Sequence, residues 1–336
     1  MEMEKTIETR QGTFYLRPYN DNDEDKVIKL WEAAFMAKMD RKIWRWKYHN
    51  NPFGRQIMLC LTDDGFPVAM YAGIPFSGNW DGLDIKMSVV IDSMSHPEYR
   101  QARSGRKGLF IQTAEHFLDI YGGSHASIFL YGFPGKRAYR LGKLFLHYRM
   151  VAEGGGYLVA NLRKLKGRFL PILGSVNSLS TETEDFDQLW KAASPYYPFS
   201  VKRNKQFIQW RFFEHPFHKY IMYTYKKWNG KMLAYVVVSV KDNIATIVDV
   251  FALPSKTALR ALFLKMSKKL LSEGILTIQV WLPKRHFITD YLIQLGFEEK
   301  EEPLGIIPGG RSFEKKLDIN FAMKNIFYTM GDGDLF

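Results

Sequence analysis

Acidic residues precede an amphipathic segment at two places in the chain. Leu30-Trp31-Glu-Ala-Ala34 and the similar run Leu189-Trp190-Lys-Ala-Ala193 each follow a cluster of Asp and Glu side chains. Acidic side chains are favoured in the first turn of a helix, where they face the positive end of its dipole. Both segments therefore predict a helix.

Apolar runs on either side of a glycine turn also occur twice, each time after a Trp-x-aromatic-x-x-x-Pro-Phe block. The first copy spans residues 56–76 with a turn at Asp64-Gly65, and the second spans residues 220–240 with a turn at Asn229-Gly230. Two such runs joined by Asp-Gly or Asn-Gly predict a β-hairpin. A further apolar strand with one aspartate follows each hairpin.

Each of these two sets of blocks is followed by an apolar strand that ends in proline, then a helix, then a Leu-x-aromatic triplet. Tyr148 lies fourteen positions after Pro134, and Phe297 lies fourteen positions after Pro283. Five blocks repeated in one order predict two tandem copies of an α/β unit, of the α+β type with a mixed sheet. We expect an N-terminal domain over residues 1–160 and a C-terminal domain over residues 161–336.

The two copies differ between the aspartate strand and the closing strand. Asp92 and Pro134 are 42 positions apart, whereas Asp249 and Pro283 are 34 apart. The extra residues fall on YRQARSGRKGLF (99–110), a basic stretch with two glycines and no acidic residue. N–H groups at a helix start carry partial positive charge, and glycine lets a ligand approach them. The loop predicts a pyrophosphate site, and a solvated basic loop is the alternative.

The composition narrows the possible partners and compartments. The 336 residues include 47 Lys and Arg against 35 Asp and Glu, a net charge of +12 that suits an anionic partner. We see no apolar run that would span a membrane and no segment typical of a signal peptide. Cys60 is the single cysteine, so we expect the reducing cytoplasm. His215 and His218 have no third ligand in view, so we expect no metal site.

The order of elements resembles that of the GCN5-related N-acetyltransferase (GNAT) superfamily, and in particular of tandem members whose second copy is degenerate. The resemblance covers residues 13–300. The motifs that carry it are Leu16-Arg17-Pro18, Asp92, His96-Pro97-Glu98-Tyr99-Arg100, Gly105–Phe110 and Gly132-Phe133-Pro134. It implies an N-acetyltransferase that moves an acetyl or other acyl group from acyl-CoA to an amine by direct attack. The acceptor would be a small molecule or a peptide.

In this superfamily the amides of the basic loop hold the coenzyme A pyrophosphate, and the preceding strand pairs with the pantetheine arm. The loop here is a few residues longer than the usual motif. The resemblance assigns coenzyme binding to Met94, Ser95, His96, Arg100, Arg103, Ser104, Gly105, Arg106, Lys107 and Gly108. The second copy lacks the loop, so we expect only the N-terminal copy to bind acetyl-CoA or another acyl-CoA.

Transfer of an acyl group to an amine needs a base for the amine proton and an acid for the departing thiolate. The resemblance implies Asp92 as the base, although Asp249 in the copy without the loop favours a structural role for both aspartates. The family places a tyrosine acid where this chain has Lys143. Tyr139, one turn earlier on the same helix face, is the candidate acid. His96 and Tyr131 are weaker alternatives.

The C-terminal segment FYTMGDGDLF (327–336) ends in an apolar residue. Docking of its aromatic side chains on the body of the protein is the simpler explanation. The alternative is that Asp332, Asp334 or the terminal carboxylate reaches the active site. Tandem acetyltransferases of the enhanced-intracellular-survival type use a C-terminal carboxylate in this way, but they carry an additional C-terminal domain that we do not expect here.

Two other functions stay open from the sequence. An aminoacyl-tRNA-dependent transferase of the peptidoglycan-bridge type also pairs two such domains and would explain the basic charge. A non-catalytic acyl-CoA sensor or nucleic-acid-binding module is the other. A steep dependence of binding on salt would mark a nucleic acid partner.

Overall fold

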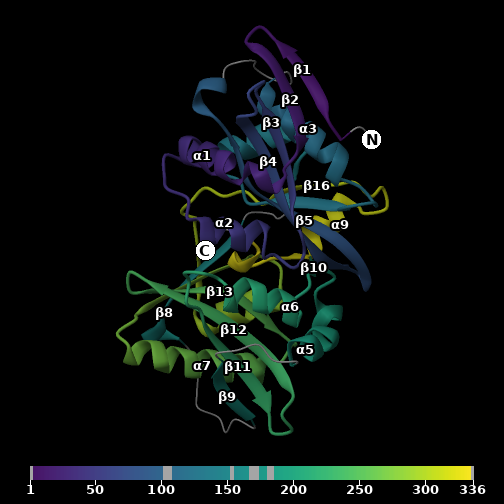
Figure 1. Cartoon of the computed structure of the whole chain (residues 1–336). Coiled ribbons are helices and arrows are strands. Elements are labelled where there is room, and N and C mark those ends of the chain that lie inside the picture. The colour runs from purple at the N-terminus through teal and green to yellow at the C-terminus, as the bar shows by residue number, and fades with distance from the viewer. Residues whose placement is uncertain (1–2, 101–107, 152–154, 166–173, 180–184, 334–336) are drawn as a thin grey trace. The chain divides into compact units, whose positions relative to one another are not determined.

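The structure is a computed structural model, and it describes residues 3–100, 108–151, 155–165, 174–179 and 185–333 (Figure 1). The chain divides into two compact units, which are described separately. Unit 1 comprises Met1–Ser77, Ile85–Val151 and Pro308–Ile319. Unit 2 comprises Gly78–Asp84, Ala152–Ile307 and Asn320–Phe336.

Unit 1 is built on a mixed sheet in the strand order β1-β2-β3-β4-β5-β6-β16-β7. Strands β5 and β6 run parallel, and β6, β16 and β7 alternate in direction. The ends of β4 and β5 that lie within residues 78–84 belong to unit 2. The elements in chain order are β1 (Lys5–Thr9), β2 (Gly12–Pro18), α1 (Glu24–Phe35), α2 (Arg41–Tyr48), β3 (Gln56–Leu61), β4 (Pro67–Trp80), β5 (Leu83–Ser95), α3 (Leu109–Tyr121), β6 (Phe129–Gly132), α4 (Lys136–Phe145), β7 (Arg149–Met150) and β16 (Gly309–Ser312).

Unit 2 has a second mixed sheet in the strand order β15-β8-β14-β13-β12-β11-β9. Its elements are β8 (Gly155–Asn161), β9 (Gly174–Leu179), α5 (Asp185–Ala193), β10 (Phe199–Val201), α6 (Lys205–Ile208), β11 (Ile221–Lys227), β12 (Met232–Lys241), β13 (Ile244–Ala252), α7 (Lys256–Ser272), β14 (Thr277–Pro283), α8 (Phe287–Leu295), β15 (Glu298–Lys300), α9 (Ile319–Asn325), β17 (Ile326–Phe327) and the 3-10 turn η7 (Met330–Asp332). A wide helical turn, Gln209–Phe213, continues α6.

The order of elements predicted for the two copies recurs in the structure. A helix pair, a hairpin, a long strand, a helix, a strand and a helix follow one another in both units. The hairpin turns place Gly65 at φ 73° and Gly230 at φ 81°, a conformation that glycine adopts without steric cost. The long strand is parallel to the closing strand in both units, β5 to β6 and β13 to β14. The mixed α/β class is confirmed.

In each unit, a strand that the sequence did not predict lies beside the closing strand of the repeat. Strand β16 lies between β6 and β7 and is antiparallel to both, although it comes more than 150 residues later in the chain. Strand β8 lies in the equivalent place between β14 and β15 and is again antiparallel to both. In each sheet, the closing strand of the repeat, β6 or β14, therefore pairs with a strand from outside that repeat.

The core of unit 1 fixes helix α3 against the sheet. Ile111, Ala114, Phe117 and Leu118 on one face of α3 pack with Tyr71 of β4 and are buried. Burial of a Leu, Ile or Phe side chain stabilises a protein by about 1.5–3 kcal/mol. These contacts hold α3 against the sheet of unit 1.

Candidate active site

Strands β5 and β6 are paired over only a short length. Their parallel register joins Met87 to Phe129, Ser88 to Leu130 and Val89 to Tyr131. Beyond this point β5 continues to Ser95, while the chain after β6 passes into α4. We call the separated portion, β5 beyond Val89, the unit 1 splay. Every described residue predicted for coenzyme binding lies at or beyond it.

Strand β5 ends with the predicted residues Met94 and Ser95, and the predicted residue His96 follows directly. Met94 is buried in the core, and the backbone N–H of His96 donates to the carbonyl oxygen of Val68 at 2.8 Å. The Oγ of Ser93 and the Nδ1 of His96 are buried and have no hydrogen-bond partner among the described residues. Buried polar atoms without a partner are uncommon, and they are consistent with a polar ligand beside this strand.

Arg100 is tied to the protein in this structure. Its guanidinium donates from Nε to the carbonyl oxygen of Ser95 at 3.2 Å and from Nη2 to that of Ala34 at 3.1 Å. Arg100 therefore links the end of β5 to the last turn of α1. The predicted residues Arg103, Ser104, Gly105, Arg106 and Lys107 lie outside the described residues.

Helix α3 begins at Leu109, and the N-cap residue before it, Gly108, has an extended backbone and provides no side-chain cap. The first turn of α3 also has no acidic residue. The leading N–H groups of a helix have no acceptor within the helix, so this start can receive an anion. The equivalent helix of unit 2 differs, because the side chain of Ser255 accepts a hydrogen bond from the N–H of Ala258 at 3.2 Å.

Asp92 sits at an irregular point of β5, where its φ of 47° interrupts the extended backbone. Its carboxylate accepts hydrogen bonds from Lys47 Nζ at 3.0 and 3.2 Å and from the Tyr48 hydroxyl at 2.9 Å. Trp31 Nε1 lies 3.5 Å from Oδ1. The side chains of Lys47 and Asp92 are only 8% and 7% exposed, so the ion pair is shielded from water.

Tyr139 lies on α4. The N-cap residue of this helix is Gly135, so its start has no side-chain cap. The ring of Tyr139 packs against Gly309 of β16, since a Cβ added there would lie 3.0 Å from Cδ2 and 3.1 Å from Cε2 of the ring. The structure records no hydrogen bond from its hydroxyl to any described residue. The hydroxyl is therefore available to a ligand. Among the described residues, Tyr139 and Asp92 share no hydrogen bond.

Sequence reasoning missed the groups that hold Asp92. Lys47 and Tyr48 belong to the Trp-x-aromatic-x-x-x-Pro-Phe block of the first copy, and its pattern alone assigns them no role in the site. The available signal was that a basic residue, Lys47 or Arg211, follows the tryptophan in both repeats. No signal in the sequence marked the buried pair of Tyr71 and Tyr148, whose hydroxyl oxygens are 2.7 Å apart. Burial raises the pKa of Tyr148 to about 12, so this pair stays protonated.

The described residues contain no group of three or more His, Cys, Asp or Glu side chains arranged to hold a metal ion. None of the helices in the described ranges has the length and apolar character needed to cross a membrane. The site in unit 1 consists of a short strand pairing, an uncapped helix start, a buried carboxylate and a tyrosine.

Comparisons with known proteins agree with this fold. The sequence pattern of the acetyltransferase (GNAT) domain family matches residues 15–142. No curated protein matches the sequence significantly. Among solved structures, a probable N-acyltransferase from Enterococcus faecalis V583 is 16% identical, with a TM-score of 0.69. The match covers 90% of this chain and 72% of that one.

Two further solved structures are similar. A GCN5-related N-acetyltransferase from Anabaena variabilis has a TM-score of 0.68 at 13% identity, over 90% of this chain and 73% of that one. Saccharomyces cerevisiae N-myristoyltransferase with bound myristoyl-CoA has a TM-score of 0.57 at 12% identity, over 92% of this chain and 85% of that one. These matches are long enough to include residues of both units. Residues 15–142 are therefore a GNAT acetyltransferase domain, and the chain has the fold of the GCN5-related N-acetyltransferases.

Proposed function

We propose that unit 1 binds an acyl-CoA along the splayed end of β5, with the pyrophosphate at the start of α3, and transfers the acyl group to an amine. The contrast between the two helix starts carries this proposal. In unit 1, residues 96–108 join β5 to an uncapped α3, whereas in unit 2 only residues 253–255 join β13 to a capped α7. In the first connection no side chain caps the leading N–H groups of the helix, whereas Ser255 takes one of them in the second, so the first suits an anion better.

The residues present fit this coenzyme in three ways. The uncapped helix start suits its pyrophosphate, and the basic residues of the loop supply cations. The splayed end of β5 suits a pantetheine arm that pairs with a strand. At the same end of β5, the buried Ser93 Oγ and His96 Nδ1 have no hydrogen-bond partner among the described residues, so they suit polar groups of a bound ligand.

The reaction is a nucleophilic substitution at the thioester carbonyl. The amine nitrogen forms a bond to the carbonyl carbon, and the carbon–sulfur bond then breaks. The amine proton goes to a base, and the coenzyme A thiolate takes a proton from an acid. We propose Asp92 and Tyr139 for these two proton transfers, as the family resemblance implies. The acceptor class is a small-molecule amine or a peptide amine.

A binding titration tests the proposal. We expect the purified protein to bind acetyl-CoA or myristoyl-CoA with a micromolar dissociation constant. The double variant Arg103→Glu/Arg106→Glu should weaken binding by at least about tenfold, because it removes two cations from the phosphate site. The matched control is Lys256→Glu/Lys268→Glu on α7 of unit 2, which changes the net charge by the same amount.

The outcomes separate clearly. Loss of binding in the first variant with unchanged binding in the control supports the coenzyme site. Equal losses in both variants would show a general charge effect, and no binding of either acyl-CoA would remove the proposed activity. Binding of tRNA with a steep salt dependence would favour the aminoacyl-tRNA-dependent alternative.

A reducing location suits the single cysteine. Cys60 is buried on β3, and burial raises the pKa of its thiol to about 12. Such a thiol is unreactive at neutral pH. We propose the cytoplasm as the location of the protein.

A further inference from the structure

Strands β13 and β14 of unit 2 separate in the same way as β5 and β6 of unit 1. Their parallel register ends with Ile247 opposite Val280, although β13 continues to Ala252 and β14 to Pro283. We call these separated ends the unit 2 splay. It is the structural equivalent of the place where we propose that unit 1 binds acyl-CoA.

A segment from late in the chain, residues 326–332, lies at the unit 2 splay. Its turn η7 contacts both β13 and β14. On the β14 side, the ring of Tyr328 lies 5.5 Å from that of Trp281 in an edge-on arrangement. On the β13 side, a Cβ added to Gly331 would lie 3.2 Å from the carbonyl oxygen of Val248.

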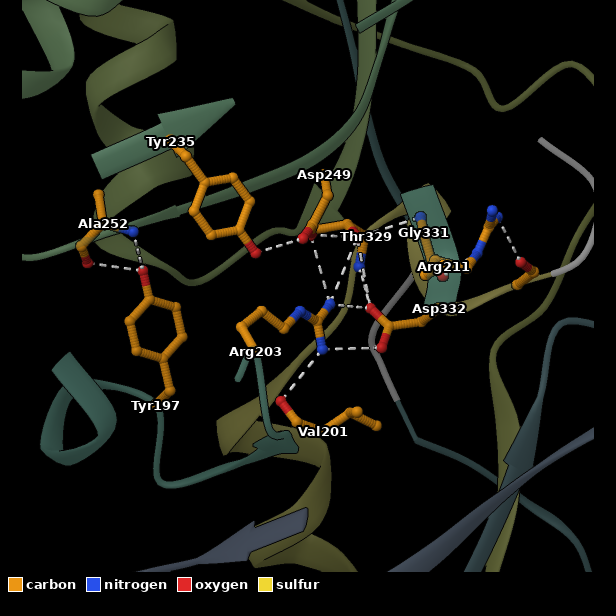
Figure 2. A network of polar contacts seen from close by, with 11 residues as sticks. Tyr197, Val201, Arg203, Arg211, Tyr235, Asp249, Ala252, Thr329, Gly331 and Asp332 are labelled. Atoms are coloured by element: carbon orange, nitrogen blue, oxygen red, sulfur yellow. Dashed lines mark hydrogen bonds and ion pairs between the residues drawn. The ribbon is translucent and has the colours of Figure 1, made fainter. Parts of the chain in front are cut away.

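Polar contacts anchor this segment to β13, as Figure 2 shows. The hydroxyl of Thr329 donates to Oδ1 of Asp249 at 2.8 Å, and the hydroxyl of Tyr235 donates to Oδ2 of the same carboxylate at 2.6 Å. Asp249 is the repeat equivalent of Asp92. The aspartate of the second copy therefore holds the chain's own segment.

Arg203 completes the anchor. Its side chain is fully buried and donates to both carboxylate oxygens of Asp332, with Nη1 at 2.9 Å from Oδ1, while Nη1 also donates to the carbonyl oxygen of Val201 at 3.1 Å. Burial opposes the charge on Arg203, but Asp332 and Asp249 outweigh this effect, raise the pKa of the guanidinium and keep it charged. The carboxylate of Asp332 also accepts the N–H of Thr329 at 2.7 Å.

Asp332 is thus not a free carboxylate. The sequence left open that it reaches an active site, but its oxygen atoms are taken by Arg203 and Thr329, and it is 4% exposed. Phe327 and Tyr328 are 2% and 1% exposed, so these two aromatic side chains are packed into the protein. This agrees with the simpler of the two explanations for the C-terminal segment. Phe336 and Asp334 lie outside the described residues.

We propose that residues 326–332 are the permanent occupant of the unit 2 splay, so that each chain binds acyl-CoA at unit 1 only. The second half of this statement rests on the proposed function, and the first half does not. A pantetheine arm could enter the unit 2 splay only by displacing a segment that a buried ion pair and several hydrogen bonds hold in place. The short, capped connection to α7 removes the phosphate site at the same end.

Hydrogen exchange of the full-length protein, followed by mass spectrometry, tests occupancy without any ligand. We expect peptides that contain residues 326–332 to exchange at least about a thousandfold more slowly than an exposed chain, because their amides are buried or hydrogen-bonded. Saturating acetyl-CoA should leave this rate unchanged. Rapid exchange without ligand, or faster exchange with acetyl-CoA, would overturn the proposal.

A pair of variants links the protection to the anchor. Thr329→Val removes the donor to Asp249 and should raise exchange in residues 326–332 by at least about tenfold. The control Ser267→Ala removes a buried hydroxyl of unit 2 that donates within α7 to the carbonyl oxygen of Phe263. It should leave the exchange of residues 326–332 unchanged, and an equal rise in both variants would contradict the anchor.

Calorimetry then gives the stoichiometry. One acyl-CoA per chain supports the second half of the proposal, and two per chain would overturn it. If the protein binds no acyl-CoA at all, the proposed function fails, while the exchange measurement still decides whether the segment occupies the splay.

Discussion

The ammonium nitrogen of Lys47 lies 3.0 Å from Oδ2 of Asp92, and almost none of either side chain is exposed. This pair joins α2 to the irregular point of β5, and the hydroxyl of Tyr48 adds a second donor from the same helix. In unit 2 the equivalent aspartate is also satisfied by buried donors. The shared arrangement favours an anchoring role for Asp92 beside the proposed role as base.

Removal of the cation should therefore be costly. We expect Lys47→Met to lower the free energy of unfolding by about 3–5 kcal/mol, because it leaves a buried carboxylate without its partner. The double variant Lys47→Met/Asp92→Asn should recover part of this loss, since no uncompensated charge remains. Urea unfolding measures both. A loss below about 1 kcal/mol in the single variant would contradict a buried ion pair.

The two roles of Asp92 lead to different kinetics. Asparagine tolerates the positive φ at this position, so Asp92→Asn keeps the backbone and removes only the charge. If Asp92 is the base, the variant loses the acidic limb of the pH profile of kcat. If Asp92 is an anchor, the variant loses stability and keeps the shape of that profile. Activity at a series of pH values, together with urea unfolding, distinguishes the two.

The hydroxyl of Tyr139 should matter for turnover and not for coenzyme affinity. We expect Tyr139→Phe to lower kcat by about 10²-fold with an unchanged dissociation constant for acyl-CoA, as removal of a general acid does. Gly309→Ala should also lower kcat, because its Cβ would push the ring by a few tenths of an ångström. Gly135→Ala has open space around its Cβ and is the control. An unchanged kcat in Tyr139→Phe would exclude Tyr139 as the acid.

His147 lies one residue beyond the C-cap of α4, and Gly296 is the C-cap of the equivalent helix α8; their φ values are 58° and 109°. The left-handed conformation costs an L-residue about 1–2 kcal/mol and costs glycine little. We expect His147→Gly to raise the free energy of unfolding by about 0.5–1 kcal/mol, after the greater entropy of glycine in the unfolded chain is counted. Gly296→Ala should destabilise the protein by about 1 kcal/mol. Thermal unfolding checks both signs.

His286 should make unit 2 sensitive to acid. Its ring packs among Tyr197, Phe287 and Phe327, and burial lowers its pKa from 6.5 to about 3. The folded state then binds fewer protons than the unfolded state between these two values. Stability is full above pH 6.5 and falls as the pH drops, by up to about 1.4 kcal/mol per pH unit.

The variant His286→Asn isolates this effect. Asparagine can still cap α8, where His286 Nδ1 now accepts the N–H of Ile288 at 3.3 Å. Between pH 6.5 and 4.5 we expect the variant to lose about 2 kcal/mol less stability than the parent protein. Urea unfolding at the two pH values measures the loss. If the variant and the parent protein lost the same unfolding free energy, His286 would be protonated in the folded state.

Most elements of the fold could be predicted from the sequence, because their signals are local. Asp-Gly and Asn-Gly mark the two hairpins, and the acidic residues ahead of Trp31 and Trp190 mark two helices. The fourteen-position spacing after Pro134 and Pro283 aligned His147 with Gly296, and their shared left-handed backbone agrees with that alignment. Of the predicted coenzyme residues, Met94, Ser95, His96, Arg100 and Gly108 lie at the end of β5 or the start of α3, and their binding role stays a prediction.

What the sequence by itself determined was the periodicity, the turns, the duplication and the site of the basic loop, each encoded within a few neighbouring residues. Only the tertiary structure decided which distant segments meet. It inserted β16 between β6 and β7, brought Lys47 to Asp92, and brought Thr329 and Arg203 to Asp249. Such pairings depend on backbone hydrogen bonds and on the burial of opposite charges between segments far apart in the chain. Neither leaves a local pattern, because any exposed edge strand or any Asp and Arg could in principle form them.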